Sequence, residues 1–179
     1  MRFNLPKSDA GRRVGLLGGS FDPAHEGHVR ISEQALKRFD LDQVWWLVSP
    51  ANPLKPQGPA PLDKRVAHAR RLFDHPRIVI TDVETQLDTR FTCDSLRALR
   101  EIYSTTRFTW LMGADNPAHI HPWLDWQDIF QLMPVGVSGR PRQALAAPRA
   151  PAARRCGSAP LGAGQSTPSG QCNGPAVRV

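Results

Sequence analysis

Short apolar runs alternate along this chain of 179 residues with longer segments whose apolar side chains recur every three or four positions. The short runs predict buried strands at residues 14–17, 44–48, 78–80 and 108–112. The helical spacing predicts helices at residues 26–39, 62–73, 93–103 and 123–133. Because strand and helix alternate, we expect an α/β fold in which an open, mostly parallel sheet carries helices on both faces.

The segment between the second strand and the second helix cannot form a regular element, because residues 49–61 contain five prolines. It is long for a connection, and it follows the carboxyl end of a strand, where ligands bind in such sheets. We therefore predict a substrate loop. The helix after it carries one apolar stripe, formed by Leu62, Val66, Ala69 and Phe73. Its basic residues are expected on the other faces, and Thr92 is expected to cap the following helix.

The pattern stops at Gly136, after which glycine, proline, alanine, arginine and serine dominate. We expect one domain at residues 1–135 and a disordered or loosely docked Arg/Pro/Gly/Ala-rich tail at residues 136–179. The formal charge is +7, but the tail holds six arginines and no acidic residue, so the first 135 residues carry only +1. All 13 aromatic residues precede Gly136. A basic tail without aromatic rings attracts phosphate but cannot stack bases, so we expect no nucleic-acid partner.

The three cysteines form no Cys-x-x-Cys pair and no disulfide framework, which favours a reduced, cytoplasmic setting. Residues 1–13 are polar and lack the apolar core of a secretory signal. No segment reaches membrane-spanning length, so we expect no membrane partner.

The first strand leads into the chemically richest stretch of the chain. Gly18-Gly19 follows it, Asp22-Pro23 predicts a turn, and a helix is expected from Glu26. The free N–H groups and the positive dipole end of a helix start converge at such a turn, which is typical of a phosphate site. His25 and His28 stand three residues apart, so both rings can face a bound anion. The alternatives are a plain tight turn, a capping histidine, or half of a metal site.

The run from Gly18 to His28 resembles G-[GS]-[ST]-F-D-P-x-H-x-G-H, the motif of the nucleotidyltransferases that carry a His-x-Gly-His pair. Among these, the chain is most similar to nicotinate-nucleotide adenylyltransferases over residues 13–140. The resemblance implies a Rossmann-like fold. The motifs of three other enzyme classes are missing from the sequence, since there is no G-x-x-x-x-G-K-[ST] of P-loop proteins, no nucleophile elbow, and no G-x-G-x-x-G of dinucleotide-binding dehydrogenases after the first strand.

The resemblance also assigns roles to individual residues. It implies catalytic roles for His25 and His28, which would steady the transition state. It implies ATP binding by Gly18, Gly19, Ser20, Phe21, Gly113 and Asp115. It implies substrate binding by Asn52, Lys55, Thr92 and Trp123. Structural alternatives stay open for three of them: Thr92 as a helix cap, Trp123 as a core residue and Asp115 as a turn residue.

The implied activity is transfer of the adenylyl group of ATP to nicotinate mononucleotide, with Mg²⁺ bound to the ATP phosphates and no metal held by the protein alone. The preference for nicotinate mononucleotide rests on the stretch Phe91-Thr92-Cys93-Asp94-Ser95-Leu96, which is similar to the family's [YF]-T-x-D-T-L, and on Trp123. A related adenylyltransferase with another phosphate acceptor is the alternative.

The sequence departs from the family in its last part. Family members carry a stretch resembling I-S-S-T-x-I-R after the fifth strand, and residues 136–179 contain none. Charge-assisted hydrogen bonds to phosphate of about 1.5–3 kcal/mol each would be lost with it. The fold is thus expected to be incomplete at its C-terminal part, and turnover to be weak or absent. A degenerate nucleotide-binding remnant of the family is the second hypothesis.

Overall fold

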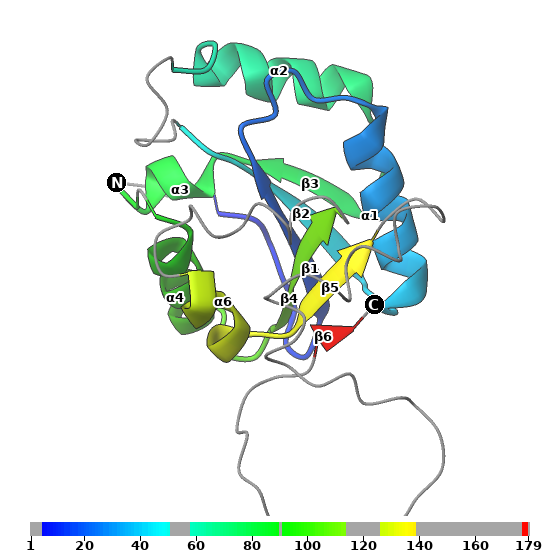
Figure 1. Ribbon diagram of the computed structural model, residues 1–179, viewed down its shortest axis with the longest axis vertical. Helices are drawn as coiled ribbons and strands as arrows, with labels where there is room; N and C mark the ends of the chain where they lie inside the picture. Colours follow the sequence, from blue (N-terminus) through cyan, green and yellow to red (C-terminus); the bar gives the residue numbers. More distant parts are fainter. Residues whose placement is uncertain (1–4, 51–57, 90, 114–125, 139–176, 179) are drawn as a thin grey trace, which may run out of the picture.

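The computed structural model describes residues 5–50, 58–89, 91–113, 126–138 and 177–178, with the side chains of 126, 127, 177 and 178 left out of the description. Its centre is one sheet in the order β3-β2-β1-β4-β5-β6, in which every pair of neighbouring strands is parallel. The strands are β1 (Arg13–Gly19), β2 (Gln43–Val48), β3 (Ile78–Thr81), β4 (Arg107–Gly113), β5 (Val135–Ser138) and β6 (Val177–Arg178). The expected open parallel sheet is confirmed (Figure 1).

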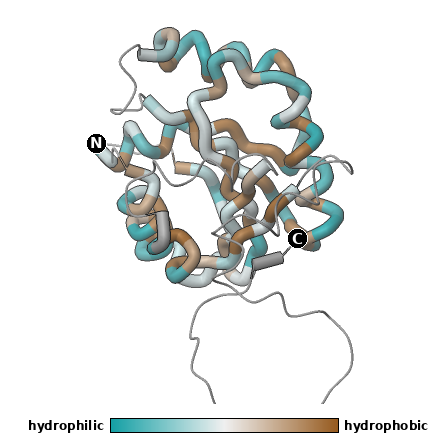
Figure 2. Tube along the Cα trace, in the orientation of Figure 1, coloured by the Kyte–Doolittle hydropathy of each residue, from teal (hydrophilic) through white to brown (hydrophobic). Residues whose placement is uncertain are grey.

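Helices cover both faces of this sheet (Figure 1). One face carries α1 (Glu26–Arg38) and α2 (Leu62–Leu72), and the other carries α3 (Val83–Gln86), α4 (Thr92–Ile102) and α6 (Trp126–Leu132). The hydrophobic core has two parts, one on each face of the sheet. Successive strand residues point to opposite faces, so Trp45 packs on the α4 side and Trp46 on the α1 side. Both rings are fully buried, and the hydrophobic segments in Figure 2 gather on the strands between the helices. The continuous apolar runs in the sequence reflect this burial on both faces.

The strands predicted at residues 14–17, 44–48, 78–80 and 108–112 are all present, each longer by one to three residues. The first helix is also confirmed, with Phe39 as its C-cap residue. The prediction that Thr92 caps α4 is wrong. Phe91 is the N-cap residue, and its carbonyl accepts the backbone N–H groups of Asp94 and Ser95 at 3.1 Å each. No side chain caps this helix, and Thr92 is its first residue.

The sheet extends past the domain boundary expected at residue 135. Val135 to Ser138 form β5, a fully buried strand that pairs with β4, and β6 pairs with its other side. The prediction that residues 136–138 belong to a loose tail is therefore wrong. Four residues that include a glycine and a serine are too few to show a strand period, so only the tertiary neighbours of β5 identify it. Residues 139–176 and 179 lie outside the described part.

Candidate functional site

The carboxyl ends of the two central strands form the floor of the candidate site. β1 ends at Gly18-Gly19 and β4 ends at Gly113, and these strands are adjacent and parallel. A Cβ atom on Gly18 would overlap the ring of Trp110 on β4, so this position has no space for a larger residue. The structure therefore brings together the predicted ATP-binding residues Gly18, Gly19 and Gly113 at one edge of the sheet.

Phe21 shapes the turn between β1 and α1. Its φ of 47° lies in the left-handed region, which costs a non-glycine residue roughly 1–3 kcal/mol. Burial of the ring offsets this cost, since it stacks on Trp46 at 5.0 Å between ring centroids and lies 4.7 Å from His28. The side chain belongs to the core, so Phe21 can offer a ligand only its backbone, whereas the neighbouring Ser20 is exposed.

His25 and His28 cap the start of α1 together. His25 is the N-cap residue, and its Nδ1 accepts the backbone N–H of Gly27 at 3.1 Å. The backbone N–H of His25 donates in turn to Nδ1 of His28 at 3.2 Å. The two ring centroids are 4.1 Å apart. A Cβ on Gly27 would come within 2.8 Å of the His25 ring, so a larger residue at position 27 would displace the ring from its capping position.

These hydrogen bonds decide which ring nitrogen can donate to a ligand. Because Nδ1 is an acceptor in both, each neutral ring carries its proton on Nε2, so Nε2–H is the donor that each ring can offer. Burial of the ring and the neighbouring His25 lower the pKa of His28 from 6.5 to about 4. At neutral pH His28 is therefore an uncharged donor. Its backbone is held by Ser32 Oγ, which donates to the His28 carbonyl at 2.9 Å and accepts from Trp46 Nε1 at 2.7 Å.

The remaining predicted residues are only partly placed. Thr92 is half-buried at the start of α4, on the face of the sheet opposite α1. Asn52, Lys55, Asp115 and Trp123 lie outside the described residues, so their assignment stays a prediction.

Arg65 on α2 is buried, with only 3% of its surface exposed, so the expectation that all basic residues of this helix face outward is wrong. Its Nε donates to the carbonyl of Ala60 at 2.6 Å, and its terminal nitrogens donate to the carbonyls of Ser20, Ser49 and Pro50. The carbonyl oxygen of Ser49 lies 2.8 Å from Nη1 of Arg65, and that of Pro50 lies 2.8 Å from Nη2. The sequence held a signal for this, because position 65 is three residues after Leu62 and so falls on the apolar stripe.

Glu84 on α3 is a second buried group that the sequence did not reveal. Its carboxyl accepts Ser95 Oγ at 3.3 Å and also hydrogen-bonds the side chain of Ser49. Burial raises the pKa of Glu84 from 4.5 to about 7, and the two serines only partly oppose the rise. It thereby links the carboxyl end of β2 to the first turn of α4, where Thr92 lies.

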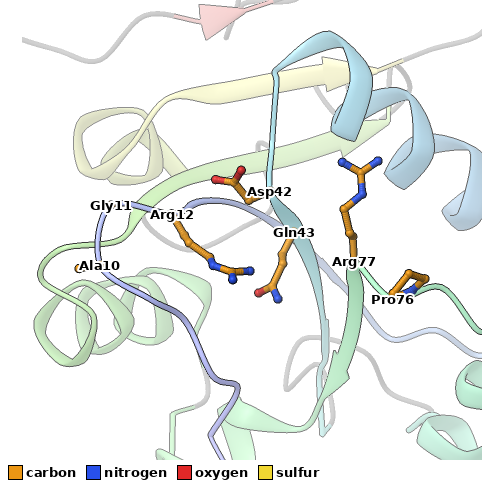
Figure 3. Close-up of a pocket in the computed structure, with 7 residues that line it drawn as sticks. All are labelled: Ala10, Gly11, Arg12, Asp42, Gln43, Pro76 and Arg77. Atoms are coloured by element: carbon orange, nitrogen blue, oxygen red, sulfur yellow. The ribbon is translucent and has the colours of Figure 1, made fainter.

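A shallow hollow lies at the opposite edge of the sheet, at the amino ends of β1, β2 and β3 (Figure 3). Its lining mixes Arg12 and Arg77 with Asp42, and it is open to solvent. Ligands of open parallel sheets bind at the carboxyl ends, so this hollow is separate from the candidate site. Within the described ranges, no group of three or more His, Cys, Asp and Glu residues could hold a metal, and no helix could cross a membrane.

An open parallel sheet with a glycine turn, a helix start and two imidazole donors at its carboxyl edge defines a nucleotide-binding α/β protein suited to phosphate-transfer chemistry. The family model described as cytidylyltransferase-like matches residues 16–158. The chain belongs to this family of nucleotidyltransferases and, by the similarities below, to its nicotinate-nucleotide adenylyltransferase branch.

Two relatives illustrate the similarity. A protein of Roseobacter denitrificans named probable nicotinate-nucleotide adenylyltransferase is 53% identical over 98% of this chain and 88% of its own length. One of Cereibacter sphaeroides with the same name is 61% identical over 84% of this chain and 81% of its own.

Solved structures share the fold at low sequence identity. The nicotinic acid mononucleotide adenylyltransferase of Plasmodium falciparum, in complex with NaAD, superposes with a TM-score of 0.64 at 17% identity. The same enzyme in complex with APC superposes with a TM-score of 0.61. Each match covers 73% of this chain and 65% of the solved chain, just under two thirds.

Proposed function

We propose that this chain transfers the adenylyl group of ATP to nicotinate mononucleotide, as a cytoplasmic step of NAD biosynthesis that yields nicotinate adenine dinucleotide and pyrophosphate. The observation that carries the proposal is the pair of Nε2–H donors that His25 and His28 present at the start of α1, beside the glycine end of β1. The identity of 53–61% to proteins named for this activity supports the same substrate pair.

The reaction needs positioned donors rather than a base. The phosphate of the mononucleotide has a second pKa of about 6 and is already an anion at neutral pH. One of its oxygens attacks the α-phosphorus of ATP, and the bond from that phosphorus to the bridging oxygen breaks. The electron pair leaves on pyrophosphate, and no proton has to move. The Nε2–H groups of His25 and His28 would stabilise the charge that builds on the phosphate oxygens.

Mg²⁺ fits this site as a companion of the nucleotide. The two imidazoles are not the oxygen ligands that Mg²⁺ prefers, and no group of three or more His, Cys, Asp and Glu residues in the described ranges could hold the ion. ATP would therefore supply most of the ligands through its own phosphates. When bound, the ion neutralises phosphate charge.

One assay tests the proposal directly. Pyrophosphate release is measured with ATP plus either nicotinate mononucleotide or its amide counterpart, for the wild-type chain and for His28→Ala. We expect release with the acid that falls about 10²–10³-fold in the variant. Equal release by the two proteins would refute the role of the histidines, and release with a different phosphate acceptor only would redirect the substrate assignment.

The second candidate is a remnant that binds nucleotide without turnover. It is favoured by the missing I-S-S-T-x-I-R stretch, whose hydroxyl and arginine donors would complete the phosphate site. On this ground we expect turnover below the ordinary enzyme range of about 1–10³ s⁻¹. ATP binding in calorimetry without any pyrophosphate release would establish the remnant, whereas an ordinary rate would exclude it.

A further inference from the structure

The guanidinium of Arg65 joins three backbone segments that border the candidate site. Its four acceptors are all carbonyl oxygens: Ser20 in the turn after β1, Ser49 and Pro50 at the end of β2, and Ala60 just before α2. These acceptors lie between 5 and 45 residues away along the chain. No carboxylate within the described ranges forms an ion pair with Arg65, so the buried cation is satisfied by backbone dipoles.

Two further contacts complete this junction. The backbone N–H of Ala60 donates to Asp22 Oδ2 at 2.9 Å, and the N–H of Ser49 donates to the carbonyl of Gly19 at 3.0 Å. Both described ends of the segment that connects β2 to α2 are thus tied to the turn that follows β1. Arg65 is the one group described here that contacts the turn and both of these ends.

We infer that Arg65 is a positioning residue that fixes the glycine turn relative to both ends of the segment between β2 and α2. The turn carries residues predicted to bind ATP, and the connecting segment carries residues predicted to bind the mononucleotide. Its catalytic consequence, which rests on the function proposed above, is that Arg65 sets the distance between the attacking phosphate and the α-phosphorus. Only the fork of a guanidinium reaches four carbonyls from three segments, and a lysine ammonium has three donors from a single nitrogen.

The test compares Arg65→Lys and Arg65→Gln with Arg71→Gln, which removes the same charge from an exposed position of the same helix. Each substrate is titrated alone by calorimetry, and kcat is measured with both substrates saturating. We expect the Arg65 variants to bind each substrate within about threefold of wild type but to lose about 10²-fold in kcat, because misplacement by about 1 Å is enough for such a loss. Arg71→Gln should match wild type in both measurements.

A second measurement does not depend on turnover. Hydrogen exchange of the amides of Ser49 and Ala60 should become about 10-fold or more faster in Arg65→Gln, since the carbonyls beside them lose their common donor, and it should not change in Arg71→Gln. If exchange is faster in Arg65→Gln but the wild-type chain shows no turnover, the structural role of Arg65 is supported and the proposed function is refuted. Unchanged exchange would overturn the positioning role, whatever the activity.

The kinetic results also test the positioning role of Arg65. If kcat of a folded Arg65→Lys protein stays within threefold of wild type, Arg65 does not position the substrates. If the Arg65 variants do not fold, Asp22→Ala removes the acceptor of the Ala60 N–H and loosens the same junction from the other side. A loss of kcat of about tenfold or more in Asp22→Ala with unchanged substrate binding supports the inference, and an unchanged kcat refutes it.

Discussion

Glu84 is a carboxyl group that is only 8% exposed and forms no ion pair in the part of the chain that the structure describes. Its pKa rises from 4.5 to about 7, so the folded protein holds this proton more tightly than the unfolded chain does. The stability that comes with the proton is fully present below about pH 4.5 and is lost as the pH rises to about 7. At 1.36 kcal/mol per pKa unit, the loss approaches about 3 kcal/mol.

His28 changes the stability of the fold with pH in the opposite direction to Glu84. Its pKa falls from 6.5 to about 4, so its contribution is present above about pH 6.5 and is lost as the pH falls toward 4. The ring is partly exposed, which reduces the size of this effect through solvent screening. Between about pH 4.5 and 6.5 the two groups therefore oppose each other. A stability profile of the wild-type protein alone would hide both.

The substitution Glu84→Gln separates them, because an amide has nearly the same shape and cannot ionise. The free energy of unfolding in urea is measured for wild type and variant from pH 5 to pH 8. The variant should gain stability relative to wild type as the pH rises, by as much as about 3 kcal/mol at pH 8 or roughly 6–12 °C in Tm. The variant by itself should show the His28 profile, with stability that falls below pH 6.5.

The matched control is Glu33→Gln, which removes a carboxylate from an exposed position on α1 and so measures the effect of net charge alone. A difference between Glu84→Gln and wild type that stays constant from pH 5 to pH 8, or that merely equals the control, would show that Glu84 is ionised in the folded protein over the whole range. The burial argument would then be wrong.

Three further predictions concern the start of α1 and the floor of the site. His25→Asn keeps a side-chain acceptor for the backbone N–H of Gly27, so Tm should change little while pyrophosphate release falls about 10²–10³-fold. Gly27→Ala places a Cβ within 2.8 Å of the His25 ring, so helix capping and activity should fall together in thermal melts and rate assays. Gly18→Ala drives a methyl group into the Trp110 ring, which should lower the free energy of unfolding by about 1–3 kcal/mol, and an unchanged urea midpoint would contradict this.

Local periodicity predicted most of the fold because it reports which side of each element is buried. The apolar runs at residues 44–48 and 108–112 became β2 and β4, which are covered on both faces. The same signal failed for β5, which is four residues long and includes Gly136 packed against the Phe39 ring. It also misplaced the cap of α4 at Thr92, since a carbonyl from Phe91 satisfies the first N–H groups without any side chain.

The sequence likewise predicted part of the candidate site, and the structure was needed for the rest. Residue types and spacing were enough to place the glycine turn, a helix start and two imidazoles at the end of β1, because those features lie within eleven consecutive residues, Gly18 to His28. They did not show which ring nitrogen carries the proton or that His28 is uncharged at neutral pH, since both follow from hydrogen bonds and burial.

Strands β1 to β4, helix α1, the glycine turn after β1 and the family motif were determined by the sequence alone, through interactions between residues close together in the chain. Only the tertiary structure decided which partners satisfy the buried side chains of Arg65 and Glu84. A buried polar group is stable where partners from other segments meet it, and the carbonyls of Ser20 and Ser49 and the hydroxyl of Ser95 lie 11 to 45 residues away in sequence. A local sequence pattern does not show contacts between residues that far apart in the chain.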